Sequence, residues 1–303
     1  MAISGNATTA EGLPVDFVRI FSWPTSELVG VALPNENGDW THEVPLTKDY
    51  GLTYIAAGCQ PITHGPYYIE VEGDQHWANV VVLLSMDEDG GAVAINDANS
   101  GPAVNLVSGA TFSSSDSQFA SLGSLSFDGD FARATLSESP LQQGESFTIE
   151  AWVKVTGSNT RNRPHGLWSC NANSSSGEFD LCITNSGTVM LRRQSSAGPA
   201  FNTTTDTSTA PLNEWVHVAH TFDGSHQRVF INGTKVIEVA DAYGVIPNNM
   251  GFALGGSYVQ RYSEYRNMLK GFMDEVRITK GVARYTGDFS PPNQPFLSYG
   301  MPE

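Results

Sequence analysis

Apolar and polar positions alternate with a period of two along much of the chain, which is the pattern of strands that bury one face. The segment 147–153 shows it most clearly, because every second side chain is apolar: Phe147, Ile149, Ala151 and Val153. Segment 80–86 is instead apolar almost throughout, as in a strand covered on both faces. Both patterns predict β-structure.

Similar short runs recur between clusters of Gly, Pro, Asn and Ser. In the first part of the chain we predict strands at 15–21, 27–33, 40–44, 52–57 and 67–71. In the remainder we predict them at 80–86, 123–127, 131–136, 146–155, 166–169, 179–184, 188–193, 215–223, 227–231, 234–239, 250–254 and 271–279. So many turn-connected strands need two packed sheets. The fold class is therefore predicted to be all-β, a small N-terminal β-sandwich followed by a jelly-roll sandwich.

The composition changes at 72–75, where Glu, Gly, Asp and Gln follow one another and end the first group of strands. We therefore predict an N-terminal arm at 1–12, a small β-sandwich at 13–73, a jelly roll at 76–296 and a C-terminal tail at 297–303. Within the jelly roll, the Asn232-Gly233 pair between two strand runs predicts a tight hairpin, because both residues tolerate positive φ.

The charge balance narrows the set of partners. There are 32 acidic and 16 basic side chains, a net charge of −16, which repels phosphate backbones and anionic lipid. We expect no nucleic-acid partner and no membrane insertion, since no run of about 18 apolar residues occurs. The first residues lack a basic start followed by an apolar run, so we expect no signal peptide.

Three cysteines, Cys59, Cys170 and Cys182, are an odd number. The expected hairpin register does not place Cys170 opposite Cys182, so reduced thiols are favoured over a disulfide.

Two resemblances follow from particular segments. The runs 12–15, 29–30, 37–40 and 50–54, closed by 58–67, resemble carboxypeptidase-regulatory-like modules at the front of phage structural proteins. That resemblance implies that 13–73 is a spacer or attachment unit without chemistry of its own.

Segments 83–87, 124–129, 147–153, 215–219, 229–233 and 271–278 resemble, in order, the laminin-G-like (concanavalin A-like lectin/glucanase) jelly roll. The ending 281–292 resembles the version common in phage tail and other virion proteins. These resemblances imply a virion protein made in the bacterial host cytoplasm.

No catalytic residues are predicted. Glu178 and Asp180 lie two apart on a strand, as glucanase carboxylates do, but Ile183 stands where that pattern would place its second glutamate. His217 and His220 are three apart on a strand, so they point to opposite faces and cannot chelate one ion. No nucleophile elbow, Walker loop or dinucleotide fingerprint occurs, so no cofactor other than calcium is expected.

Calcium is considered because laminin-G-like jelly rolls often bind it beside their adjacent first and last strands. The resemblance places Asp87 and Asp274 there. Because Ca²⁺ takes six to eight oxygen ligands, backbone carbonyls and water would have to complete the site. An ordinary solvated turn is the alternative for the acidic run after Met86.

A loop rich in Tyr and Arg is the candidate contact surface: Tyr258, Arg261, Tyr262 and Tyr265. Such side chains stack on sugars, but they are equally enriched where subunits meet, and in a virion protein we favour the subunit contact.

We therefore expect a non-enzymatic tail or particle-surface component that contacts other virion proteins, copies of itself and host glycans. The alternatives are a capsid decoration protein, and a soluble carbohydrate-binding lectin or inactive glycosidase-like module.

Overall fold

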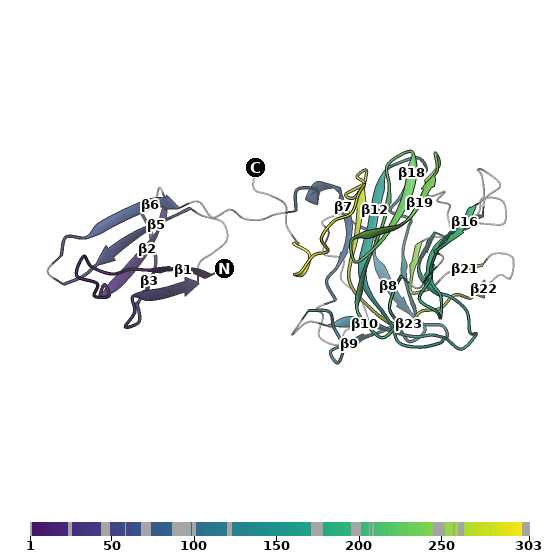
Figure 1. The fold of residues 1–303 in the computed structure, drawn as a ribbon, viewed down its shortest axis with the longest axis horizontal. Helices are drawn as coiled ribbons and strands as arrows, with labels where there is room; N and C mark the ends of the chain where they lie inside the picture. The colour runs from purple at the N-terminus through teal and green to yellow at the C-terminus, as the bar shows by residue number, and fades with distance from the viewer. Residues whose placement is uncertain are drawn as a thin grey trace. The chain divides into compact units, whose positions relative to one another are not determined.

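A computed structural model describes all 303 residues except 1, 24–25, 44–48, 58, 68–73, 87–97, 99–100, 120–122, 171–177, 195–200, 206, 208, 245–251, 257, 260–263 and 299–303. The regular elements of the described part are β-strands, apart from one turn of 3₁₀ helix at Trp77–Asn79. The chain divides into two compact units, with the change at Gly73–Asp74 (Figure 1). No described helix is long and apolar enough to cross a membrane.

Unit 1 holds a four-stranded and a two-stranded sheet. Its strands are β1 (Ala2–Asn6), β2 (Phe17–Trp23), β3 (Leu28–Ala32), β4 (Asp39–Glu43), β5 (Asp49–Ile55) and β6 (Ile62–Tyr67). The four-stranded sheet has the order β3-β2-β5-β6, and β1 pairs with β4. A small apolar core lies between the sheets and includes Val18, Ile20, Trp40, Tyr50 and Leu52.

Two features of unit 1 differ from the prediction. The segment 1–12, expected as an arm, supplies β1, whose residues pair antiparallel with β4. The last strand lies at Ile62–Tyr67, earlier than the predicted 67–71, because it pairs with β5 through Ile62, Thr63 and His64. A polar segment around Thr63 gives little apolar signal, so the sequence pattern pointed to the aromatic residues that follow it.

Unit 2 contains the remaining strands, arranged in a seven-stranded and an eight-stranded sheet with a two-stranded ribbon. They are β7 (Val80–Leu84), β8 (Val104–Val107), β9 (Thr111–Ser113), β10 (Ser124–Asp128), β11 (Arg133–Leu136), β12 (Phe147–Val155), β13 (His165–Cys170), β14 (Glu178–Ile183), β15 (Val189–Gln194), β16 (Phe201–Thr204), β17 (Val216–Phe222), β18 (His226–Ile231), β19 (Thr234–Ala240), β20 (Phe252–Leu254), β21 (Tyr258–Val259), β22 (Glu264–Tyr265) and β23 (Lys270–Lys280).

The two large sheets pack face to face, as Figure 1 shows for unit 2. One has the order β19-β18-β17-β12-β23-β10-β9, with β7 also paired to β23; the other has the order β16-β15-β14-β13-β20-β11-β8. The first and last long strands of the unit, β7 and β23, are therefore neighbours. The prediction of an all-β jelly-roll sandwich is confirmed.

Strand β12 shows how the sequence pattern builds this core. Phe147, Ile149, Ala151 and Val153 all belong to the apolar cluster between the sheets. The intervening side chains, including Glu150, point to the outer face of the eight-stranded sheet, as the period-two pattern predicted.

The predicted hairpin is also confirmed. β18 and β19 are joined with Ile231 opposite Thr234. Asn232 and Gly233 both have positive φ, 47° and 78°, which is the conformation of a type I′ turn.

The segment 281–296 lies along the outer face of the eight-stranded sheet. Thr148 donates its hydroxyl to the Val282 carbonyl, and Thr221 donates to the Tyr285 carbonyl. The Tyr285 ring stacks on Phe289, with centroids 3.6 Å apart. These contacts cover a face that would otherwise be open to solvent, so the ending that resembles virion proteins is an integral part of the jelly roll.

Candidate functional site

The outer face of the seven-stranded sheet differs from that covered face. At its centre, the Asp180 carboxylate on β14 is buried. It accepts hydrogen bonds from Nε and Nη2 of Arg192, at 3.0 and 2.6 Å. Asn267 adds an N–H donor to the same carboxylate at 3.3 Å, and its carbonyl accepts the Gly166 N–H. The segment around Asn267 therefore covers the middle of this face and holds its polar groups in fixed positions.

The two sides of the same face remain accessible. Side chains that point outward there are polar and half-buried or exposed: Asn105, Arg133, Thr135, Arg192, Asn202 and Thr204. They lie on β8, β11, β15 and β16. The hydroxyl, amide and guanidinium groups on each side can exchange hydrogen bonds with a polar ligand. We take these six side chains, three on each side of the covered middle, as the candidate functional site and call them the polar face.

The outer face of the eight-stranded sheet instead holds a buried charged network. Arg277 donates from Nε and Nη2 to Glu150 Oε1, at 3.0 and 2.8 Å, and from Nη1 to Asp74 at 2.9 Å. Arg284 binds both oxygens of Asp74. Tyr285 donates its hydroxyl to the other oxygen of Glu150 at 2.9 Å.

The groups of this network shift one another's pKa values. Burial acts to raise the pKa of Glu150, but Arg277 and His217 outweigh it and hold that pKa well below its usual range. Burial and the neighbouring Glu150 carboxylate raise the pKa of Tyr285. Perturbed groups of this kind mark catalytic sites only when they line a cleft. Glu150 is fully buried, so the network is structural: it fixes segment 281–296 and the start of unit 2 on the sheet.

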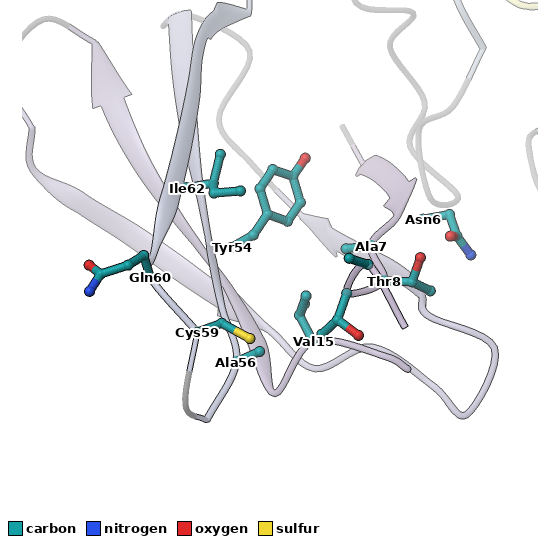
Figure 2. Close-up of a pocket in the computed structure, with 11 residues that line it drawn as sticks. Asn6, Ala7, Thr8, Val15, Tyr54, Ala56, Cys59, Gln60 and Ile62 are labelled. Carbon is teal, nitrogen blue, oxygen red and sulfur yellow. The ribbon is translucent and has the colours of Figure 1, made fainter. Parts of the chain in front are cut away.

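Unit 1 contains an open pocket of about 810 Å³, drawn in Figure 2. Tyr54 and Ile62, from β5 and β6, lie on one side of it, and Ala7 and Val15 lie on the other. Asn6, Thr8 and Gln60 add polar groups, and the exposed thiol of Cys59 is at the edge. The size falls within the range of ligand pockets, about 300–1,000 Å³.

The residues predicted to bind calcium are only partly described. Asp87 lies outside the described residues, while Asp274 is buried on β23 and accepts the Gln118 N–H at 2.9 Å. Calcium needs several oxygen ligands, and the described residues include only one of the two predicted carboxylates. Elsewhere in the described part, no group of three or more His, Cys, Asp or Glu side chains could hold a metal ion. Calcium binding stays a prediction.

The aromatic loop is also only partly described. Tyr258 and Tyr265 pair across the ribbon of β21 and β22. Arg261 and Tyr262 lie outside the described residues. The structure therefore places two of the four predicted residues opposite each other on paired strands. The contact surface stays a prediction.

The two histidines on β17 do lie on opposite faces. His217 packs against Trp152 and lies 3.3 Å from Glu150, whereas His220 lies between the sheets beside Trp168 and Phe179. Burial lowers the pKa of His220 to about 4, so it is neutral at pH 7.

The cysteines follow the predicted register. Cys170 is opposite Phe179, whereas Cys182 is opposite Gly166. All three thiols are free, and Cys170 and Cys182 are buried.

Residues 128–284 match the family described as the concanavalin A-like lectin/glucanases superfamily. The match covers just over half of the chain, and the protein belongs to this family. The fold itself had been predicted from the sequence; phage origin and the carboxypeptidase-regulatory-like character of unit 1 stay predictions.

Solved structures of similar shape have low sequence identity. Domain 4 of AbnA, an extracellular GH43 arabinanase from Geobacillus stearothermophilus in complex with arabinotriose, is 19% identical; 67% of this chain and 93% of that chain are covered, with a TM-score of 0.47. The receptor-binding domain of botulinum neurotoxin D is 14% identical, with 71% and 50% covered and a TM-score of 0.47. The CBM40 domain of the Ruminococcus gnavus IT-sialidase, bound to α2,3-sialyllactose, is 18% identical, with 46% and 78% covered and a TM-score of 0.38. No curated protein matches the chain.

Sequence reasoning missed the polar face. Asn105, Asn202 and Thr204 lie on β8 and β16, neither of which was predicted. These strands are short, and only one of their two faces is apolar. The one available signal was the alternation of Asn202 and Thr204 with Phe201 and Thr203 in segment 201–204.

Proposed function

We propose that this protein is a non-enzymatic carbohydrate-binding protein whose jelly roll binds saccharide on the polar face. The observation that carries the proposal is the contrast between the two outer faces of the sandwich. Segment 281–296 covers one face, whereas the other presents accessible amide, hydroxyl and guanidinium groups on both sides of its covered middle. Saccharides are recognised by such groups because they satisfy pairs of sugar hydroxyls.

The proposal that the protein is not an enzyme is supported by the state of Asp180. A hydrolytic carboxylate has to reach the glycosidic bond, either as a proton donor or as a nucleophile. Asp180 is buried, and both of its oxygens are bound to Arg192. This carboxylate is therefore committed to holding the sheet.

The test is binding of the full chain to an array of glycans, followed by titration of the best ligand. Replacing Asn202 by Ala and Thr204 by Val on β16 should weaken that binding about tenfold, since two hydrogen-bonding groups are lost. Thr234→Ala, exposed on β19 of the other sheet, is the matched control and should bind normally.

Absence of binding to every glycan would overturn the proposal. Equal loss in the β19 control would move the site away from the polar face. Release of reducing sugar from a bound polysaccharide would overturn the non-enzymatic part alone.

A second proposal is that unit 1 attaches the protein to a larger particle, as a phage virion component would require. Five of the six large apolar side chains that the described part exposes belong to this unit: Leu13, Leu28, Val31, Leu33 and Ile62. Leu28 and Val31 lie on edge strand β3, with Leu33 just after it, and neighbouring exposed apolar side chains favour a protein contact.

This second proposal is tested by electron microscopy of the native phage particle, with the copies of this chain located and counted. Copies in threefold or sixfold sets on the tail or its fibres support tail attachment. Many copies over the capsomers support decoration. Absence from the particle leaves the free lectin as the function.

A further inference from the structure

The basic side chains next to the polar face form a distinct group. Arg133 belongs to both, because its side chain points to the polar face while its Nη1 donates to the Phe131 carbonyl at 3.1 Å. Phe131 is 47% exposed, the one large apolar side chain that the described part of unit 2 exposes. The Arg161 guanidinium lies over its ring, 5.5 Å from the centroid.

The loop that carries Arg161 is held rigidly by Asn159. The buried Asn159 side chain accepts the N–H groups of Arg161 and Arg163 at 3.2 and 3.0 Å. Its amide donates to the carbonyls of Arg163 and Met268, both at 2.9 Å. One buried side chain therefore fixes the backbone from which two arginines project.

Strand β23 brings a further cation, Lys270, next to this loop. Lys270 is exposed and lies opposite Asp128 in the backbone pairing of β23 with β10. A Cβ added at Gly129 would lie 2.7 Å from the Lys270 Cβ and 3.2 Å from the Asn159 backbone, so the three segments are in close contact. We call Phe131, Arg133, Arg161, Arg163 and Lys270 the basic rim.

Two carboxylates of the described part nearby, those of Asp128 and Asp130, form hydrogen bonds within the loops. Asp128 Oδ1 accepts the backbone N–H groups of residues 130, 131 and 132. Asp130 accepts the Thr160 hydroxyl at 2.9 Å. These acidic groups shape the turn, while exposed Arg163 and Lys270 present positive charge to solvent on a protein of net charge −16.

We propose that the basic rim binds the carboxylate or sulfate groups of an acidic polysaccharide whose chain continues over the adjoining side of the polar face, on β8 and β11. The guanidinium groups pair with the anionic substituents, and the exposed Phe131 ring packs against a sugar ring. This inference rests on the proposed carbohydrate-binding function and narrows its ligand to acidic glycans. The remaining acidic surface of the protein repels polyanions, so contact is confined to the rim.

The experiment measures binding of the full chain to polygalacturonate, which carries carboxylates, to dextran sulfate and to neutral dextran. The double substitution Arg161→Gln with Arg163→Gln should weaken binding of the acidic ligand about tenfold or more and leave neutral binding within about twofold. Phe131→Ala should weaken both, because stacking does not depend on charge. The matched control is Arg19→Gln, an exposed arginine on β2 of unit 1.

Added salt should weaken acidic binding of the native protein more than that of the double variant, since two charged contacts are already missing there. Comparing the affinities for polygalacturonate and dextran sulfate shows whether carboxylate or sulfate is preferred. A preference for either group supports the proposal. Unchanged acidic binding in the double variant overturns it while leaving carbohydrate binding intact. Absence of any saccharide binding overturns both. Binding of a DNA oligonucleotide as tight as that of the acidic glycan overturns the saccharide assignment.

Discussion

Glu150 and Arg277 form a buried ion pair on neighbouring strands, with Glu150 Oε1 accepting two guanidinium N–H groups at 3.0 and 2.8 Å. Each side chain is less than a tenth exposed. Charges this deeply buried are costly unless they are paired. Because Tyr285 donates its hydroxyl to the other oxygen of Glu150, the pair also helps to hold segment 281–296 on the sheet.

The first prediction concerns that pair. Glu150→Gln leaves Arg277 with one fewer counter-ion in a dry site, and we expect the free energy of unfolding to fall by about 3–5 kcal/mol. Urea denaturation followed by tryptophan fluorescence measures this. Lys235→Gln, which removes the solvent-accessible ion pair with Glu238 on the same sheet, should change little. A loss as small as in that control would mean that the buried network contributes no net stability.

The second prediction is a pH dependence caused by His220. Burial lowers the pKa of this imidazole to about 4 in the native state, against about 6.5 in the unfolded chain. The unfolded state therefore binds more protons between pH 6.5 and 4, and the free energy of unfolding falls as pH falls through that window, by up to about 3 kcal/mol. Protonation would also place a second donor against the Trp168 indole N–H, which lies 3.4 Å from His220 Nδ1.

Denaturation at pH 7 and pH 5 measures the slope. His220→Gln should be less stable at pH 7 but should show a shallower dependence on pH. An unaltered slope in the variant would assign the dependence to other groups, such as His165, whose pKa burial also lowers.

The third prediction concerns a close approach at the hairpin. A Cβ on Gly233 would lie 1.8 Å from the Phe289 carbonyl oxygen, so Gly233→Ala must displace segment 281–296. Gly224→Ala is the matched control, because Gly224 also has positive φ, 92°, but open space around it. We expect about 1 kcal/mol of destabilisation in the control and at least about 1 kcal/mol more at Gly233. Limited proteolysis should then cut after residue 280 only in Gly233→Ala. Equal effects of the two substitutions would show that backbone conformation alone is responsible.

The fourth prediction concerns the thiols. Cys59 is exposed, whereas Cys170 and Cys182 are buried, and burial raises the pKa of Cys182 well above its usual range. A thiol reagent should label one cysteine in the native protein and three in denaturant. Cys59→Ser should remove the native reaction. Rapid labelling of two native thiols would contradict the burial of the pair.

The accuracy of the sequence predictions followed the position of each strand in its sheet. Central strands such as β12 and β17 were predicted well, because one face is continuously apolar and the hydrophobic core enforces that pattern. The missed strands β1, β8, β9, β16, β21 and β22 are all at sheet edges. An edge strand pairs on one side only and needs few apolar residues, so its sequence resembles a loop.

The same reason limited what could be predicted of the candidate site. The polar face depends on side chains of edge strands, and the basic rim depends on Asn159 joining segments that are distant in sequence, such as Met268 at 109 residues' separation. Spacing within one segment contains no information about such contacts. The sequence did indicate the fold, because the alternation of apolar and polar side chains within each central strand is a local pattern.

The ion pairs of Asp74 also bear on how the protein is made. Asp74 is bound by Arg284, 210 residues later in the chain, and β7 pairs with β23. Contacts between the two ends of the unit cannot form during translation until the last strand has left the ribosome. The jelly roll therefore cannot complete its folding until β23 and Arg284 have been synthesised, and a chain cut short before β23 would leave β7 without this partner and Asp74 without its two arginines.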